Sequence, residues 1–494
     1  MTILAHHTDT LTRDALAVLQ PGFEGTTAPS WLLRHIGEGL SSVGLFGRNI
    51  TAPEQLAALT AQLRGEREDL LVAIDEEGGD VTRLEVRGGS SFPGNLALGA
   101  VDDTDLTRGV ARELGRRLAE CGVNFNWAPS ADVNSNPDNP VIGVRSFGSD
   151  TGLTARHTAA YVQGLQSAGV AACTKHFPGH GDTNVDSHHA LPRIDVDLDT
   201  LQARELVPFR AAIEAGTKAV MSAHILVPAL DPTRPATLSP QILTGLLRKE
   251  LGYEGLIVTD GMEMNAIAGT YGIERGSVLA IAAGADAICV GGGLADEATV
   301  LRLRDALVAA VREGALPEER LADAAERVRA LAGWTFRARP DARQEGSRAS
   351  GIGLEAARRA LAVTGNPSPV AAPYVATLAP VANIAVGDET PWGVAEELAA
   401  LVPGTASGVY AEGSGAEDVL AAAGERTVVA VVRDAHRHPW MTGALDALVA
   451  ARPDTVVVEM GLPRAEPRGA LYIATHGAAR VCGRAAAEVV AGVR

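Results

Sequence analysis

Cysteine is scarce in this sequence, and its distribution excludes a disulfide-based scaffold. Four cysteines occur in 494 residues, and they are far apart in the chain: Cys121, Cys173, Cys289 and Cys482. Three of them lie in apolar, strand-like runs, and none belongs to a closely spaced pair of the kind that binds metal. We therefore expect free thiols in a reducing cytoplasm.

Basic residues are also few relative to acidic residues. The chain has 43 Lys and Arg against 60 Asp and Glu, a formal net charge of −17, which disfavours nucleic acid and anionic membranes as partners. It lacks the roughly 18-residue apolar run of a membrane span. The first 22 residues lack the cationic start and apolar stretch of a signal peptide. These absences predict a cytoplasmic protein that acts on a small molecule.

The apolar residues are arranged in short continuous runs, and the length of the chain predicts two domains. Continuous rather than alternating hydrophobicity is typical of parallel strands covered on both faces. Eight such runs occur in the first part of the chain, at 16–23, 43–48, 70–76, 123–128, 170–177, 219–224, 256–260 and 286–291. Stretches between them, such as 106–120 and 153–168, have helical apolar spacing. Eight β-then-α units predict an α/β fold of the (β/α)8 TIM-type barrel class, although an open doubly wound sheet would give a similar pattern.

A second, smaller domain is predicted after an exposed linker rich in Arg, Ser and Gly. We expect a catalytic barrel over 1–334, the linker over 335–353 and an α/β sandwich over 354–494. Strand-like runs lie at 381–387, 427–434, 455–461 and 470–477, and helical patterns at 393–402, 439–452 and 481–493.

Polar residues follow directly after several of the predicted barrel strands. They are Asp75 to Glu77, the pair Lys175 and His176, His224, and Asp260. Because the active site of such a barrel lies at the carboxyl ends of its strands, their shared position indicates one site. Asp260 could alternatively be the N-cap of the next helix.

The segment Lys175 to His189, KHFPGHGDTNVDSHH, holds four of the twelve histidines of the chain. Its proline and glycines predict a loop over the barrel mouth. A carboxylate beside an imidazole makes a general acid/base suited to neutral pH, a role that fits Asp186 and His188. Asp260 could then be the nucleophile of a retaining glycosidase.

Two other interpretations of this segment stay open. His176, His180 and Asp182 could offer divalent metal ligands, although Pro178 makes a helical i, i+4 arrangement improbable. The histidines could also simply hydrogen-bond within a folded loop. A non-enzymatic sugar-binding protein is a further alternative for the whole chain.

Several segments resemble bacterial glycoside hydrolase family 3 β-N-acetylglucosaminidases. The matching stretches are AIDEEGGDVTRL (73–84), NFNWAPSADVNSNPDNPVIGVRSFGSD (124–150), CTKHFPGHGDTNVDSHHALP (173–192), AVMSAHILVPALD (219–231) and VTDGMEM (258–264). They span the first domain, and KHFPGHGDT followed by DSH is highly specific. The second domain resembles the sandwich of two-domain members only weakly.

The resemblance implies roles for individual residues and no metal or organic cofactor. Asp260 would be the nucleophile and Asp186 with His188 the acid/base pair. The N-acetylglucosamine would be bound by Asp75, Arg83, Arg145, Lys175 and His176, with His224 behind them. The implied activity is hydrolysis of terminal β-linked N-acetylglucosamine from muropeptide fragments or chitin oligosaccharides. A phosphorylase is the alternative, because a histidine would not repel phosphate.

Two further features concern the rest of the chain. Asp80 departs from the family pattern, in which arginine is common at this position, so the local charge balance is expected to differ. The segment RDAHRHPW (433–440) contains His436 and His438 near a predicted strand end. We expect it to cap a helix or pack at the domain interface rather than to be catalytic.

Overall fold

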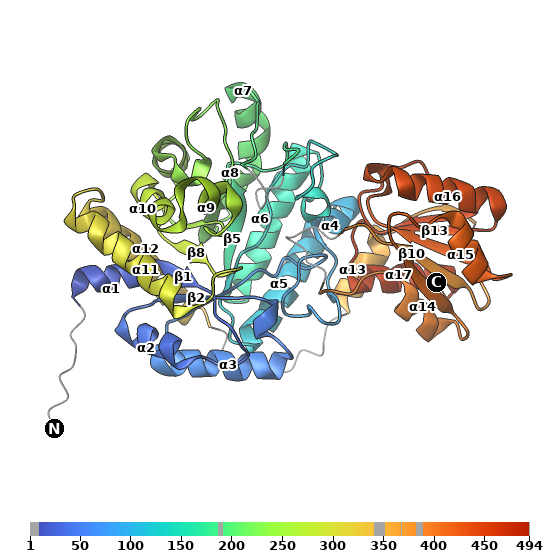
Figure 1. Cartoon of the computed structure of the whole chain (residues 1–494), viewed down its shortest axis with the longest axis horizontal. Coiled ribbons are helices and arrows are strands. Elements are labelled where there is room, and N and C mark those ends of the chain that lie inside the picture. Colours follow the sequence, from blue (N-terminus) through green and yellow to red (C-terminus); the bar gives the residue numbers. More distant parts are fainter. Residues whose placement is uncertain (1–8, 186–190, 340–350, 367, 382–388, 494) are drawn as a thin grey trace.

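The computed structural model describes residues 9–185, 191–339, 351–366, 368–381 and 389–493. These residues form two α/β lobes, a larger one that begins near the N-terminus and a smaller one that contains the C-terminus (Figure 1). Within the described residues, no helix combines the length and the apolar character that crossing a lipid bilayer requires.

The larger lobe is a TIM-type barrel, as predicted. Its described strands, one in each of the eight apolar runs, are β1 (Leu19–Pro21), β2 (Ser42–Leu45), β3 (Leu71–Ile74), β4 (Phe125–Asn126), β5 (Ala171–Phe177), β6 (Ala219–Ser222), β7 (Leu256–Thr259) and β8 (Ile288–Val290). Strands β2 to β7 pair in sequence order, all parallel, and β1 pairs with β8. The backbone of Thr259 donates to Ala287, which joins β7 to the β8 segment. Gln20 bonds Ser42 between β1 and β2.

Helices cover the outside of this barrel. They are α1 (Thr10–Ala17), α2 (Ser30–Glu38), α3 (Pro53–Glu66), α4 (Asn95–Val101), α5 (Thr104–Glu120), α6 (Thr151–Ser167), α7 (Leu198–Thr200), α8 (Leu206–Glu214), α9 (Asn265–Tyr271), α10 (Ile273–Ala283), α11 (Glu297–Arg312) and α12 (Glu318–Arg337), with the π-helices η3 (Leu201–Glu205) and η5 (Gln241–Glu250). The predicted helical stretches 106–120 and 153–168 correspond to α5 and α6.

Successive strand residues alternate between the barrel interior and the helical layer. In β3, Leu71 and Ala73 belong to the interior cluster, whereas Val72 and Ile74 pack in the outer core. Helix α12 closes the amino-terminal end of the barrel, because its Leu331 joins the interior cluster and Thr335 accepts a hydrogen bond from Asn124. The open end is therefore the carboxyl end of the strands, where ligands bind in such barrels.

The smaller lobe has helices on both faces of one sheet. Its described strands are β9 (Ala362–Gly365), β10 (Tyr374–Leu378), β11 (Ala406–Tyr410), β12 (Val428–Val432), β13 (Val456–Glu459) and β14 (Leu471–Ala474). Their order is β11-β10-β12-β13-β14-β9, parallel except for β9. The helices are α13 (Ile352–Ala360), α14 (Ala395–Leu401), α15 (Ala416–Ala423), α16 (Pro439–Ala451) and α17 (Arg480–Val490).

The predicted elements of this lobe fit in part. The runs 427–434, 455–461 and 470–477 contain β12, β13 and β14, and the three helical patterns correspond to α14, α16 and α17. The predicted strand 381–387 lies outside the described residues apart from Val381. The sequence reasoning did not find β9, β10 and β11.

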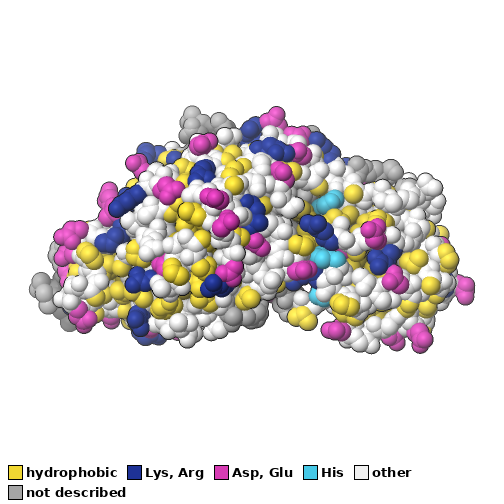
Figure 2. Space-filling model, turned by 90° about the horizontal axis from the view of Figure 1, so that it is seen from above, with side chains coloured by type: hydrophobic (Ala, Val, Ile, Leu, Met, Phe, Trp, Pro, Cys, Tyr) yellow, Lys and Arg dark blue, Asp and Glu magenta, His cyan; other side chains and the backbone are white. Residues whose placement is uncertain are grey.

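Helix α13 connects the two lobes. It packs against α4 and α5 of the barrel, and Ala356 belongs to the core of the barrel while Ala357 belongs to that of the smaller lobe. Gly353 lies so close to the barrel that an added Cβ would overlap the carbonyl oxygen of Ser91. Histidine and basic side chains gather along the boundary between the lobes on the face seen in Figure 2.

Candidate active site

The loop after β3 is shaped by the buried carboxylate of Glu76. This carboxylate accepts hydrogen bonds from the backbone N–H groups of Arg83 (2.7 Å) and Leu84 (2.8 Å), while Asn126 of β4 bonds both backbone groups of Glu76. Burial raises the pKa of Glu76 to about 7. Glu76 thus folds the loop back on itself and is not available to a ligand.

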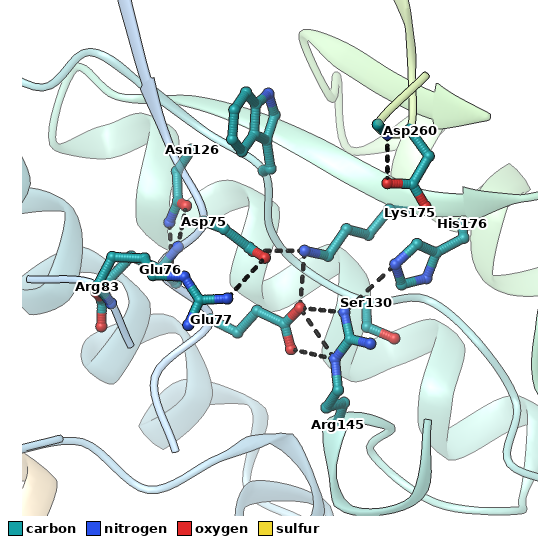
Figure 3. A network of polar contacts seen from close by, with 12 residues as sticks. Asp75, Glu76, Glu77, Arg83, Asn126, Ser130, Arg145, Lys175, His176 and Asp260 are labelled. Carbon is teal, nitrogen blue, oxygen red and sulfur yellow. Dashed lines mark hydrogen bonds and ion pairs between the residues drawn. The ribbon is translucent and has the colours of Figure 1, made fainter. Parts of the chain in front are cut away.

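Glu77, the next residue, lies at the centre of a buried ionic network (Figure 3). Its Oε1 is 2.6 Å from Nη2 of Arg145 and 2.7 Å from Nζ of Lys175. Lys175 also binds Asp75 Oδ1 at 2.6 Å, and Arg83 Nη2 approaches Asp75 Oδ2 at 4.0 Å. Five side chains, four from the loops after β3 and β4 and one from β5 itself, are therefore in one cluster.

The charges in this network stabilise one another. Burial acts to raise the pKa of Glu77, but Arg145 and Lys175 overcome it and hold that pKa well below its usual range. Burial acts in the opposite direction on Lys175, whose pKa is raised by Asp75 and Glu77. Asp75 is the more accessible carboxylate, with 23% of its side chain exposed against 3% for Glu77. Asp75 is thus the member placed to meet a ligand.

His176 is held in one tautomer by its two neighbours. Its Nδ1 is 2.6 Å from Oδ2 of Asp132, and its Nε2 is 3.3 Å from Nη2 of Arg145. A guanidinium can only donate a hydrogen bond, so Nε2 of His176 accepts one from Arg145. Nδ1 therefore carries the proton and donates a hydrogen bond to Asp132. Burial acts to raise the pKa of Asp132, but His176 lowers it to about 2.

Asp260 follows β7 at the same end of the barrel. Its backbone N–H donates to Ser222 O, and its Oδ1 accepts from the N–H of Gly261 at 2.8 Å. The next helix, α9, begins at Asn265 with Met264 as its N-cap residue, so the interpretation of Asp260 as a helix cap is wrong. Figure 3 shows Asp260 on the Lys175 and His176 side of the network.

His224 lies behind this turn. Its Nε2 donates to the carbonyl oxygen of Gly261 at 3.0 Å, and its Nδ1 is 2.9 Å from Thr237 Oγ1. The residue is fully buried. It therefore supports the Asp260–Gly261 turn, and its predicted place behind the sugar-binding residues stays a prediction.

Asp186 and His188 lie outside the described residues, so their predicted pairing stays a prediction. The chain leading to them is fixed at the barrel mouth. Asn139 donates to the carbonyl oxygens of His180 (2.8 Å) and Gly181 (3.0 Å), and Arg204 Nη2 is 2.6 Å from Asp182 Oδ2.

The proposed metal ligands do not converge. Asp182 is paired with Arg204, and Nδ1 of His176 is taken by Asp132. His180 is buried, and its pKa is lowered to about 4 by burial and by His176. Within the part of the chain that the structure describes, no group of three or more His, Cys, Asp or Glu side chains is arranged to hold an ion. The metal interpretation of His176, His180 and Asp182 is thus wrong for this set.

The segment 433–440 lies at the boundary between the lobes, as expected. His436 Nε2 is 3.3 Å from the carbonyl oxygen of Pro137, in the loop after β4. Arg433 forms an ion pair with Asp80 of the barrel. His438 occupies the N-cap position of α16.

Asp132 was not predicted from the sequence, and Glu77 was predicted only as one of the polar residues after a strand, not as the centre of the network. Both are acidic residues shortly after a barrel strand, which was the available signal. Their partners, Arg145 and His176, are distant in sequence, so only the folded chain reveals the pairing.

Comparison with known proteins agrees with this geometry. Residues 27–331 match the model of the glycosyl hydrolase family 3 N terminal domain. Beta-hexosaminidase A of Pseudoalteromonas piscicida is 38% identical over 312 residues, which cover 58% of this chain but only 52% of that protein. Beta-hexosaminidase of Neisseria gonorrhoeae is 36% identical over 265 residues, covering 52% of this chain and 73% of that protein.

Solved structures extend the likeness to the second lobe. A glycoside hydrolase family 3 beta-N-acetylglucosaminidase from Paenibacillus sp. str. FPU-7 superposes with a TM-score of 0.87 and 35% identity, covering 98% of this chain and 97% of that one. NagZ from Neisseria gonorrhoeae, in complex with N-trifluoroacetyl-D-glucosamine, gives a TM-score of 0.55 and 30% identity over 64% of this chain and 89% of that one. The matched family model, which covers more than half of the chain, identifies the protein as a member of glycoside hydrolase family 3.

Proposed function

We propose that this protein is a retaining exo-β-N-acetylglucosaminidase that removes terminal β-linked N-acetylglucosamine. The observation that carries the proposal is the gathering of Asp260 with Asp75, Lys175 and His176 at one end of the barrel, from the ends of β7, β3 and β5. A carboxylate beside a set of fixed charged donors is what a retaining glycosidase needs on one side of the sugar.

Sugar binding would depend on Asp75, Arg83, Arg145, Lys175 and His176. Lys175 fixes the position of Asp75 through their 2.6 Å contact, so a carboxylate oxygen is presented to sugar hydroxyls in a set direction. A charged hydrogen bond of this kind discriminates strongly, because a ligand that lacks the hydroxyl displaces water from the carboxylate without replacing the lost hydrogen bond. Arg145 fixes His176 in the same way from its other side.

In the proposed reaction, Asp260 attacks the anomeric carbon and forms a glycosyl ester. The protonated imidazole of His188, oriented by Asp186, gives its proton to the departing oxygen. The same imidazole then takes a proton from water as the water cleaves the ester, so the configuration is retained. The hydrogen bond from the N–H of Gly261 holds the carboxylate of Asp260 in position.

The nucleophile can be tested by changing Asp260→Asn and assaying p-nitrophenyl β-N-acetylglucosaminide. We expect activity to fall to background while the fold is kept. A matched control is Asp296→Asn, because Asp296 caps α11 and asparagine caps equally well. Mass spectrometry after reaction with a slowly hydrolysed activated N-acetylglucosaminyl fluoride should find the sugar on the peptide that contains Asp260. Labelling of another residue would contradict the assignment.

The natural substrate and the acceptor need a separate experiment. Hydrolysis of N-acetylglucosaminyl-anhydromuramic acid and of chitobiose should be compared, each with and without phosphate, in the cytoplasmic conditions that the composition predicts. Free N-acetylglucosamine as the product in both phosphate conditions is expected for a hydrolase. N-acetylglucosamine 1-phosphate would instead identify the alternative, a phosphorylase.

A further inference from the structure

A tight hairpin joins two parts of the proposed sugar site. Glu77 N–H donates to Val81 O at 3.1 Å, and the turn between them runs through Gly78 (φ 76°) and Gly79 (φ 64°), with Asp80 at its tip. Gly79 packs so closely on Gly94 that an added Cβ would lie 2.4 Å from the Cα of Gly94. The hairpin therefore has little freedom on its barrel side.

The smaller lobe holds the tip of this hairpin. Asp80 Oδ1 accepts a hydrogen bond from the N–H of Ala478 at 2.7 Å, just after β14. Asp80 Oδ2 forms an ion pair with Nη2 of Arg433, which follows β12, at 2.5 Å. The two atoms do not have the geometry of a hydrogen bond. Only 1% of the Asp80 side chain is exposed.

Arg433 is the cation that makes this burial tolerable. Burial raises the pKa of Asp80, Arg433 opposes that rise, and the nearby Asp434 and Glu77 reinforce it. The guanidinium of Arg433 also lies 6.0 Å from the ring centre of Trp392. Removing Arg433 would thus leave a buried carboxylate among other acids, with one backbone donor.

We propose that Arg433 and Asp80 are positioning residues through which the smaller lobe fixes the sugar site of the barrel. The hairpin that they hold carries Glu77 at one end, which orders Arg145 and Lys175, and leads at the other end into Arg83. This inference rests on the proposed function. It also explains why an aspartate can stand at position 80, where arginine is common in the family. The charge of Asp80 is balanced by the second lobe rather than by the barrel.

The test is a kinetic comparison of Asp80→Asn, Arg433→Met and their double variant on p-nitrophenyl β-N-acetylglucosaminide, in the full chain. For each single variant we expect KM to rise roughly 2- to 30-fold with kcat little changed, the range of coupling carried through packed networks. The double variant should be no worse than the worse single variant, because the two residues act through one contact. Arg433→Lys keeps the charge and is included in case Arg433→Met does not fold.

A matched control distinguishes positioning of the sugar site from a general weakening of the contact between the lobes. Arg359→Met removes the 2.9 Å ion pair between α13 and Asp103 at the start of α5, and neither of these described residues belongs to the hairpin or is bonded to Asp80 or Arg433. Its KM should be unchanged. Wild-type KM in folded Arg433 variants, or a fall in kcat at unchanged KM, would overturn the inference. Absence of turnover in the wild-type protein would instead refute the proposed function.

Discussion

Replacing Glu77 by glutamine tests whether the buried network is organised by charge. The change keeps the shape of the side chain but removes the anion that two buried cations share, at 2.6 Å from Arg145 and 2.7 Å from Lys175. Glutamine can accept from one of them but neutralises neither. Asp75 then has to balance Lys175 alone, and Arg145 loses its ion-pair partner and keeps only the weaker influence of Asp75 and Asp132.

The expected cost follows from the burial of all three groups. Their side chains are at most 6% exposed, so solvent screens the charges little. Removing one partner of a buried ion pair costs about 3–5 kcal/mol, because the remaining charge is left desolvated. An exposed pair is worth about 0–1 kcal/mol, so Asp69→Asn, which removes the partly exposed pair with Arg67, is a suitable control.

The assay is equilibrium unfolding in urea, followed for the transition of the barrel. The double variant Glu77→Gln with Arg145→Met should lose less than the sum of the single variants, because it leaves no unpaired charge. The expected coupling is about 0.5–3 kcal/mol. A Glu77→Gln variant within about 1 kcal/mol of the wild type, or strictly additive losses, would refute the reasoning.

Three further predictions concern the neighbouring residues. Asp132, whose folded pKa is about 2, contributes about 2 kcal/mol of stability that is present above its unfolded pKa near 4 and lost as the pH falls through 2. Asp132→Asn should therefore destabilise the protein by that amount at pH 7, and urea titrations in which the difference does not shrink toward pH 2 would contradict this. Gly79→Ala forces a methyl group against Gly94 at a positive φ and should cost about 1–3 kcal/mol in the same assay, whereas Gly65→Ala, whose added Cβ meets nothing within 4 Å, should not destabilise. His188→Ala should slow cleavage of poor leaving groups far more than of good ones in steady-state kinetics, and equal losses on both would exclude His188 as the acid.

The sequence alone predicted the architecture of the barrel well. Each of the eight apolar runs contains a strand, because strands of a parallel barrel are covered on both faces and must be apolar throughout. The same reasoning failed at the edges of the second sheet. All four residues of β9 are exposed, and β11 is only partly buried, so neither carries a continuous apolar signal. Strand β10 is buried, but it lies between Pro373 and Pro380, and prolines are typical of loops and strand edges.

The residue types of the site could also be predicted from the sequence, because polar residues at the ends of apolar runs are easily recognised. Asp75, Lys175, His176 and Asp260 were found in this way. What each of them contacts was decided only by the folded chain, since ion pairs such as Glu77 with Arg145 join residues 68 positions apart. The partnership of Asp80 with Arg433 is the extreme case. It requires the barrel and the smaller lobe to pack against each other, and no local sequence pattern predicts which residues of two surfaces will be in contact.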